Sequence, residues 1–142
     1  MKMKYIKISS WFLAISMFMF GVLKFVDPFK GWYTVQVANS GLGQLSYAMG
    51  IMGEIAVGTT LFVCLLFRQR ISTKLYNLLT GFSFVTVIIM MLTGVYVHLH
   101  AKVPADVLPL KIKPPYIPIF FLLVAFSNLI LTARNMLKAK RT

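Results

Sequence analysis

The chain has 142 residues, of which 58% are hydrophobic and only 13% are charged. A soluble domain is about half apolar and about one quarter charged, so this composition excludes an ordinary soluble protein. The 15 Lys and Arg outnumber three acids and give a net charge of +12. Because these cations flank long apolar segments, they indicate a membrane protein and no binding to nucleic acid.

Four apolar segments are long enough to cross a bilayer as helices, since each crossing needs about 20 residues. They occupy residues 8–26, 46–67, 75–97 and 116–133. We therefore predict an all-α fold, an integral membrane four-helix bundle that forms a single transmembrane domain over residues 1–142. The basic start resembles a signal peptide, but the apolar run is too long and no small-residue cleavage site follows, so we expect an uncleaved helix.

The distribution of the cations predicts the orientation of the bundle. Ten lie beside the span ends of one side: Lys2, Lys4, Lys7, Arg68, Arg70, Lys74, Arg134, Lys138, Lys140 and Arg141. The other five, Lys24, Lys30, Lys102, Lys111 and Lys113, belong to the opposite side. The positive-inside rule then predicts a multi-pass protein of the cytoplasmic (inner) membrane with both termini in the cytoplasm. The two longer loops face outward and cap the bundle.

The first of these loops has the pattern of a short helix over residues 28–40. Asp27 is a suitable N-cap and Pro28 suits the first helical position. Apolar residues at helical spacing predict an amphipathic helix on the membrane surface, with Trp32 and Tyr33 as interfacial anchors. An irregular loop is the alternative.

The second loop, "HLHAKVPADVLPLKIKPPYIP", is rich in proline, which favours an extended path. It is also apolar enough to form a sticky patch if it were exposed. We therefore expect it to pack as a lid over the mouth of the bundle.

Lys24 and Glu54 are the two ionisable residues within the apolar spans. Either one alone in hydrocarbon would cost several kcal/mol, so such residues usually face the bundle and pair. With a rise of about 1.5 Å per residue, Glu54 lies roughly 13 Å and Lys24 about 3–5 Å inside the outer ends of their spans. That difference is within reach of the two side chains, so we predict a Lys24–Glu54 pair.

Glycines accompany both charged residues. Gly50 and Gly58 share one helix face with Glu54, and Gly21 lies one turn before Lys24. Small residues at this spacing predict close helix packing. Three roles remain open: a pair that only fixes helix register, a pair that forms one wall of a polar pocket, or an unpaired and protonated Glu54.

His98 and His100 lie at the outer end of the third span, with Asp106 in the loop that follows. Imidazole suits zinc and copper, but two histidines and one acid fall short of a metal signature, so we expect no metal. A hydrogen bond from either histidine to a quinone or a lipid head group is the other interpretation. The single cysteine, Cys64, excludes an intrachain disulfide or thiol relay.

The motifs "FGVLKFVDP" at residues 20–28 and "GEIAVG" at residues 53–58, with four spans in 142 residues, resemble the DoxX and DoxX-like family of bacterial membrane proteins. Motifs support the resemblance in the first two spans, and architecture supports it elsewhere. The glycine, lysine and glutamate of the family pattern correspond to Gly21, Lys24 and Glu54. The family is named for a subunit associated with thiosulfate:quinone oxidoreductase, and relatives are linked to redox stress complexes.

The resemblance implies a membrane subunit near the quinone pool. The chain has no cofactor motif of its own, so a partner redox subunit or a bound quinone would have to carry electrons. We predict a protein that binds a small apolar ligand near the Lys24–Glu54 pair, with His98 or His100 as further polar contacts. Its sequence assigns it no catalytic activity. The alternative is a non-catalytic assembly protein whose Gly50–Glu54–Gly58 face packs on a partner. A transporter would need a homo-oligomer, because four spans make a narrow path.

Overall fold

The computed structural model of the chain is helical over most of the part it describes, residues 2–139 for the backbone and residues 4–137 for the side chains. The four long helices are α1 (Lys2–Leu23), α3 (Gln44–Leu66), α4 (Thr73–Leu99) and α5 (Tyr116–Ala139). The short helix α2 (Phe29–Asn39) follows α1, and two 3₁₀ turns, Ala105–Val107 and Pro109–Lys111, lie between α4 and α5. The predicted all-α four-helix membrane bundle is confirmed, since each long helix can cross a bilayer.

Two predicted span ends differ from the observed helices. The sequence predicts a first span that reaches residue 26, but α1 ends at Leu23 and the chain turns through residues 24–28. The amides of Phe25 and Val26 bond to carbonyls three residues earlier, which tightens this turn. The predicted last span ends at residue 133, whereas α5 continues to Ala139 because the residues beyond the apolar run still favour a helix.

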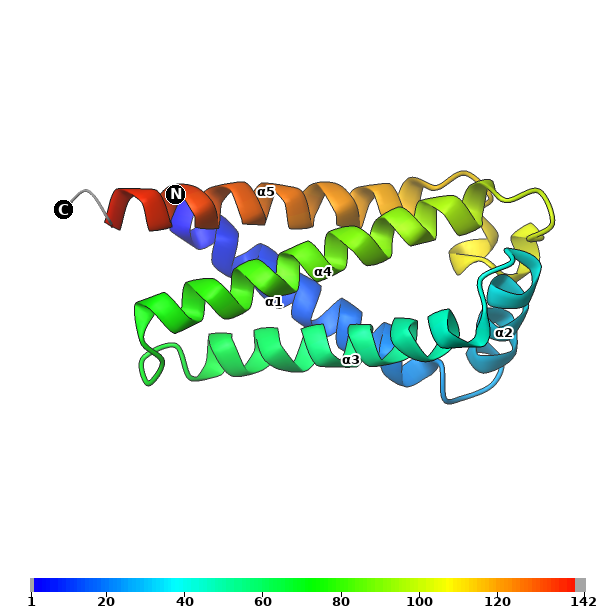
Figure 1. Ribbon diagram of the computed structural model, residues 1–142, viewed down its shortest axis with the longest axis horizontal. Helices are drawn as coiled ribbons and strands as arrows, with labels where there is room; N and C mark the ends of the chain where they lie inside the picture. Colours follow the sequence, from blue (N-terminus) through cyan, green and yellow to red (C-terminus); the bar gives the residue numbers. More distant parts are fainter. Residues whose placement is uncertain (1, 140–142) are drawn as a thin grey trace.

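The four long helices form a ring in which each helix contacts two others. The most extensive contacts are those of α1 with α3 and of α4 with α5, and contacts of α3 with α4 and of α1 with α5 close the ring. In Figure 1, α3 and α5 run along opposite edges while α1 and α4 cross between them. A hydrogen bond of 2.7 Å between Ser9 Oγ and Asn128 Oδ1 also joins α1 to α5.

One apolar core fills the centre of the ring, and all four long helices contribute to it. Its buried members are Leu13, Ala14, Met17, Val57, Leu61, Phe84, Val87, Met91, Phe121 and Ala125. The outward faces are apolar too, because no more than 33% of any spanning segment is buried. Met52 and Phe82, for example, are 71% and 74% exposed. Such an apolar exterior requires lipid around it, so the protein is a multi-pass membrane protein in contact with the bilayer.

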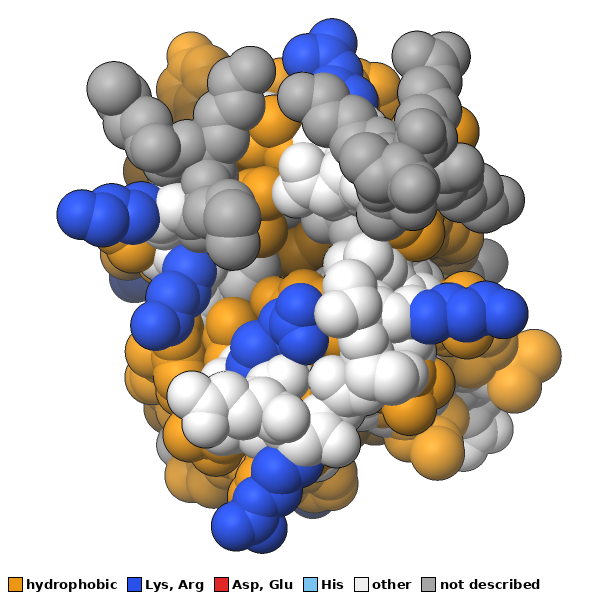
Figure 2. All heavy atoms as spheres, turned by 90° about the vertical axis from the view of Figure 1, so that its left-hand side faces the viewer, with side chains coloured by type: hydrophobic (Ala, Val, Ile, Leu, Met, Phe, Trp, Pro, Cys, Tyr) orange, Lys and Arg blue, Asp and Glu red, His pale blue; other side chains and the backbone are white. Residues whose placement is uncertain are grey.

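Both ends of the described chain lie at the same end of the bundle as the α3–α4 turn (Figure 1). We call this the basic end. Figure 2 shows Lys and Arg side chains spread over it and no acidic side chain in view. Its described cations are Lys4, Lys7, Arg68, Arg70, Lys74 and Arg134. Lys140, Arg141 and the side chains of Lys2 and Lys138, which the orientation argument also uses, lie outside the described residues.

The opposite end, the cap end, consists of α2 and residues 100–115. The proline-rich loop packs around a small cluster of its own, the cap core, in which Val103 and Leu108 are each 1% exposed beside Val97. The amide of Gln36 donates to the Val107 carbonyl, which ties α2 to this loop. The loop therefore does pack over the bundle mouth, although with two 3₁₀ turns where an extended path was predicted.

Helix α2 matches the short helix expected over residues 28–40, but two details of that expectation are wrong. Pro28 is the N-cap residue, and no side chain caps the helix, so Asp27 does not have the predicted role. Tyr33 does not lie outward as an interfacial anchor. Its hydroxyl lies 3.2 Å from the backbone carbonyl of Tyr47, inside the mouth of the bundle.

Close packing of α1 on α3 leads to the first testable prediction. A Cβ on Gly58 would lie only 2.7 Å from the backbone nitrogen of Phe18, whereas one on Gly81 would meet nothing within 4 Å. Gly58→Ala should destabilise the bundle by about 1–3 kcal/mol, because backbone cannot yield as a flexible side chain can. The matched Gly81→Ala should stabilise it slightly, by less than about 1 kcal/mol. Unfolding in mixed micelles, followed by circular dichroism, measures both; equal effects would contradict the packing.

Candidate functional site

Lys24 and Glu54 meet near the cap end of the bundle. Lys24 is the first residue after α1, and its Nζ lies 2.6 Å from Oε1 of Glu54 on α3. The two side chains are only 16% and 8% exposed. The structure therefore brings together the two charged residues that the sequence places in the spans, in the hydrogen-bonded geometry of a strong ion pair.

Glycine is what allows α1 to come close enough for this pair to form. A Cβ on Gly21 would lie 2.6 Å from Ile55 Cγ1 and 3.2 Å from Glu54 Cβ, so a side chain there would push the two helices apart. Gly58, one turn beyond Glu54 toward the basic end, has Phe18 of α1 against it in the same way. The contact of α1 with α3 thus holds the end of α1, and with it Lys24, over the carboxylate.

Tyr33 of α2 completes the cluster around the ion pair. Lys24 Nζ lies 3.9 Å from the centroid of the Tyr33 ring, a cation–π contact. The hydroxyl of Tyr33 fills the space that a side chain on Gly50 would need, since a Cβ there would lie 2.0 Å from it. Burial, then the charge of Glu54, then Tyr47 raise the pKa of Tyr33 well above its ordinary value, so the phenol stays neutral.

The second oxygen of Glu54 has no hydrogen-bond partner among the described residues. Its Oε2 is buried and accepts no hydrogen bond from the described residues. An ionised carboxylate can accept several hydrogen bonds, and a buried oxygen without one carries a desolvation penalty. The cluster therefore contains one strong hydrogen-bond acceptor, Glu54 Oε2, to which no described residue donates.

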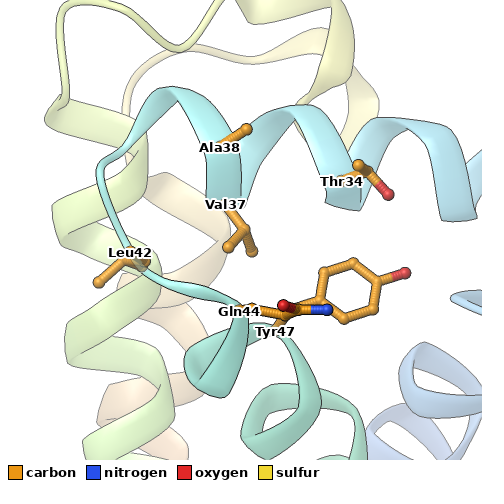
Figure 3. Close-up of a pocket in the computed structure, with 6 residues that line it drawn as sticks. All are labelled: Thr34, Val37, Ala38, Leu42, Gln44 and Tyr47. Atoms are coloured by element: carbon orange, nitrogen blue, oxygen red, sulfur yellow. The ribbon is translucent and has the colours of Figure 1, made fainter.

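A hollow of about 340 Å³ opens between α2 and the start of α3, and Lys24, Glu54 and Tyr33 are not among its lining residues. We call it the cap hollow. It is lined mainly by apolar atoms, from Thr34, Val37, Ala38, Leu42, Gln44 and Tyr47. Figure 3 shows Val37 extending from α2 toward Gln44 and Tyr47 of α3. The Tyr47 ring also packs against Tyr33, with ring centroids 4.8 Å apart, so it links the hollow to the ion pair.

The two histidines belong to a different part of the cap end. His98 is buried, and its Nδ1 lies 3.3 Å from the carbonyl of Lys113, while the Lys113 ammonium donates to the His100 carbonyl at 2.7 Å. These contacts attach the loop to the end of α4. Within the described residues no hydrogen bond joins either histidine to Lys24 or Glu54.

Asp106 is exposed and does not complete a metal site with the histidines. Among the described residues, no group of three His, Cys, Asp or Glu side chains is placed to hold a metal ion.

The glycine face of α3 is covered within the chain. Phe18 of α1 lies over Gly58, Tyr33 of α2 lies over Gly50, and Glu54 itself is 6% exposed. A partner helix could not pack on this face without displacing α1 and α2. The geometry therefore runs against the assembly alternative, in which Glu54 points away from its own bundle.

Sequence reasoning missed Tyr33 and Tyr47 as members of the site. An aromatic pair flanking a membrane helix is usually an interfacial anchor, so neither residue carries a distinctive signal. Gly50 is a stronger signal, because a glycine on the same helix face as a buried acid indicates that another side chain occupies the space beside it. The spacing of residues does not predict that this side chain belongs to α2.

Comparison with known proteins identifies no relative of this chain. The chain matches no protein-family model, no curated protein and no solved structure. The site must therefore be judged by its own chemistry.

The ion pair leads to the second prediction. Glu54→Gln and Lys24→Met should each destabilise the bundle by at least about 2 kcal/mol, because each leaves a largely buried charge without its partner. The double variant should recover much of that loss, since it leaves no unpaired charge. Unfolding in mixed micelles gives the coupling free energy; strictly additive losses would show that the two charges do not interact.

Proposed function

We propose that this chain is a DoxX-like integral membrane subunit that binds a small apolar ligand, a quinone or a lipid, in the cap hollow beside the Lys24–Glu54 pair. Its role would be in a quinone-linked redox system of the inner membrane. The observation that carries the proposal is an apolar hollow that Tyr47 connects to a cluster in which Glu54 Oε2, a buried acceptor, receives no hydrogen bond from the described residues. Ligand sites commonly combine an apolar lining with a few placed polar groups.

The DoxX-like motifs support the same assignment from the sequence. Gly21, Lys24 and Glu54, which match the family pattern, are also the residues that form and position the ion pair. Four spans with no readable catalytic set suit a subunit that binds and orients a membrane-borne ligand. A partner redox subunit would carry out the electron transfer, with a quinone as the mobile carrier.

The position of the cap hollow suits a ligand that arrives from the bilayer. The hollow lies at the level where α3 begins, so a long tail could remain among the acyl chains while a ring occupies the hollow. Tyr47 would contact the ring and connect it, through Tyr33, to the Lys24–Glu54 pair, and Gln44 would provide a polar contact. The cap loop, which His98 and Lys113 attach to α4, would close the outer side.

Ligand retention tests the function. Ala38 is exposed on α2 and lines the hollow, so Ala38→Trp should fill it and reduce co-purifying ligand about tenfold or more. Ala101→Trp, an equally large change at an exposed cap-end position outside the lining, should retain the ligand of the parent chain. Native mass spectrometry of the purified chain measures both. A parent chain with nothing bound, or equal retention by the two variants, would rule out this site.

We further propose that the basic end faces the cytoplasm, so that both termini are inside. Cysteine labelling with a membrane-impermeant maleimide tests this in a Cys64→Ala background. Lys102→Cys, on the cap end, should react in intact cells, whereas Lys74→Cys, in the basic end, should react only after lysis. Both positions are exposed. The opposite pattern would invert the topology.

A further inference from the structure

The basic end of the bundle carries positive charge that acidic side chains of this chain do not neutralise. Of the three acids in the sequence, Asp27 lies beside α2, Asp106 lies in the proline-rich loop of the cap end, and Glu54 pairs with Lys24. No acidic side chain is therefore left for the cations of the basic end (Figure 2). Like charges that gather on one surface repel each other, so this end attracts anionic partners.

The turn between α3 and α4 places two of these cations at the boundary of the membrane. Arg68 and Arg70 are exposed and lie between Leu66, the last residue of α3, and Thr73, the first residue of α4. The apolar side chains that flank them are exposed as well: Leu66, Phe67, Leu75 and Leu78. Because hydrocarbon covers the exposed apolar side chains of a spanning helix, the turn lies where hydrocarbon meets the lipid head groups.

Both guanidinium groups lie against aromatic rings next to the turn. Arg68 Cζ is 4.3 Å from the centroid of the Tyr76 ring, and its Nη1 donates to the Ile71 carbonyl at 3.4 Å. Arg70 Cζ is 6.0 Å from the centroid of the Phe67 ring. A ring contacts the face of a guanidinium group and leaves N–H groups along its edge to donate. The two arginines therefore present hydrogen-bond donors at the depth of the head groups.

We propose that the α3–α4 turn binds the phosphate of an anionic phospholipid, with Arg68 and Arg70 as the donors. The edge of a guanidinium group matches two phosphate oxygens in a bidentate contact. The acyl chains lie along the exposed side chains of Leu75 and Leu78 at the start of α4. These apolar neighbours favour a lipid over a soluble anion, which would leave them uncovered.

The charge of the basic end selects among phospholipids. A lipid that is neutral overall brings its own cation next to its phosphate, where Arg68 and Arg70 already supply positive charge. An anionic lipid brings no such cation, so the two arginines bind it more tightly. This site is separate from the cap hollow, and it does not depend on the ligand proposed there.

Two lipids with the same acyl chains test the proposal. Dioleoyl phosphatidylglycerol is anionic, whereas dioleoyl phosphatidylcholine is neutral overall. Each is titrated into the delipidated full chain in micelles of a neutral detergent, and native mass spectrometry measures the bound lipid. We expect phosphatidylglycerol to bind about tenfold or more tightly than phosphatidylcholine. Equal affinities would overturn the proposal.

A pair of double variants tests whether the preference comes from the turn. Arg68→Gln/Arg70→Gln should lower the affinity ratio of phosphatidylglycerol to phosphatidylcholine about fivefold or more. Lys30→Gln/Lys102→Gln removes two exposed cations from the cap end, so it lowers the net charge by the same amount and should keep the parent ratio. An equal fall in both variants would mean that the lipid responds to net charge alone, which would overturn the assignment to the turn.

A third variant keeps the proposal testable if the glutamine variant does not fold, which circular dichroism would show. Arg68→Lys/Arg70→Lys retains both charges but cannot make bidentate contacts, so the preference should persist and fall about twofold or more. An unchanged preference would overturn the guanidinium groups as donors. Displacement of the bound phosphatidylglycerol by excess inorganic phosphate or poly-glutamate would assign the turn to a soluble anion and overturn the lipid site.

Discussion

The contact between Lys24 and Glu54 is the constraint on which the rest of this structure depends. Two charges at the depth of a lipid bilayer are stable only if they face each other, and the helices must be placed to permit it. Gly21 and Gly58 let α1 lie close to α3, so that the chain leaves α1 directly above the carboxylate. The turn that follows then carries α2 back across the mouth, and the Tyr33 ring comes to lie against the ammonium group.

The same contact is the starting point of the proposed function. Pairing satisfies one oxygen of Glu54, and the other, which is buried, receives no hydrogen bond from the described residues. The helix that covers it, α2, also forms one wall of an apolar hollow, and Tyr47 belongs to both. An apolar hollow that Tyr47 connects to a polar cluster suits the proposed ligand site, since such sites combine an apolar lining with a few placed polar groups.

The sequence predicts the parts of this architecture that follow from local chemistry. Apolar length predicts the four spans, and the rarity of charge within them singles out Lys24 and Glu54. Their neighbouring glycines predict the close packing. The role of Tyr33 depends on the path of the turn after α1, which no local pattern encodes, and for the same reason Asp27 is a plausible N-cap that the structure does not use. The sequence predicts His98 as a polar contact of the ligand, and in the structure Nδ1 of its ring lies 3.3 Å from the Lys113 carbonyl.

The most direct test of the account is the distance between the two charged groups in a bilayer. Dipolar recoupling in solid-state NMR, with ¹⁵N on the Lys24 side chain and ¹³C on the Glu54 carboxyl of the full chain in liposomes, measures it. A contact of 2.6 Å between Lys24 Nζ and Glu54 Oε1 predicts strong dephasing of the carboxyl signal by that nitrogen. No dephasing, with the lysine nitrogen in contact with water or lipid phosphate, would show that the two charges do not meet.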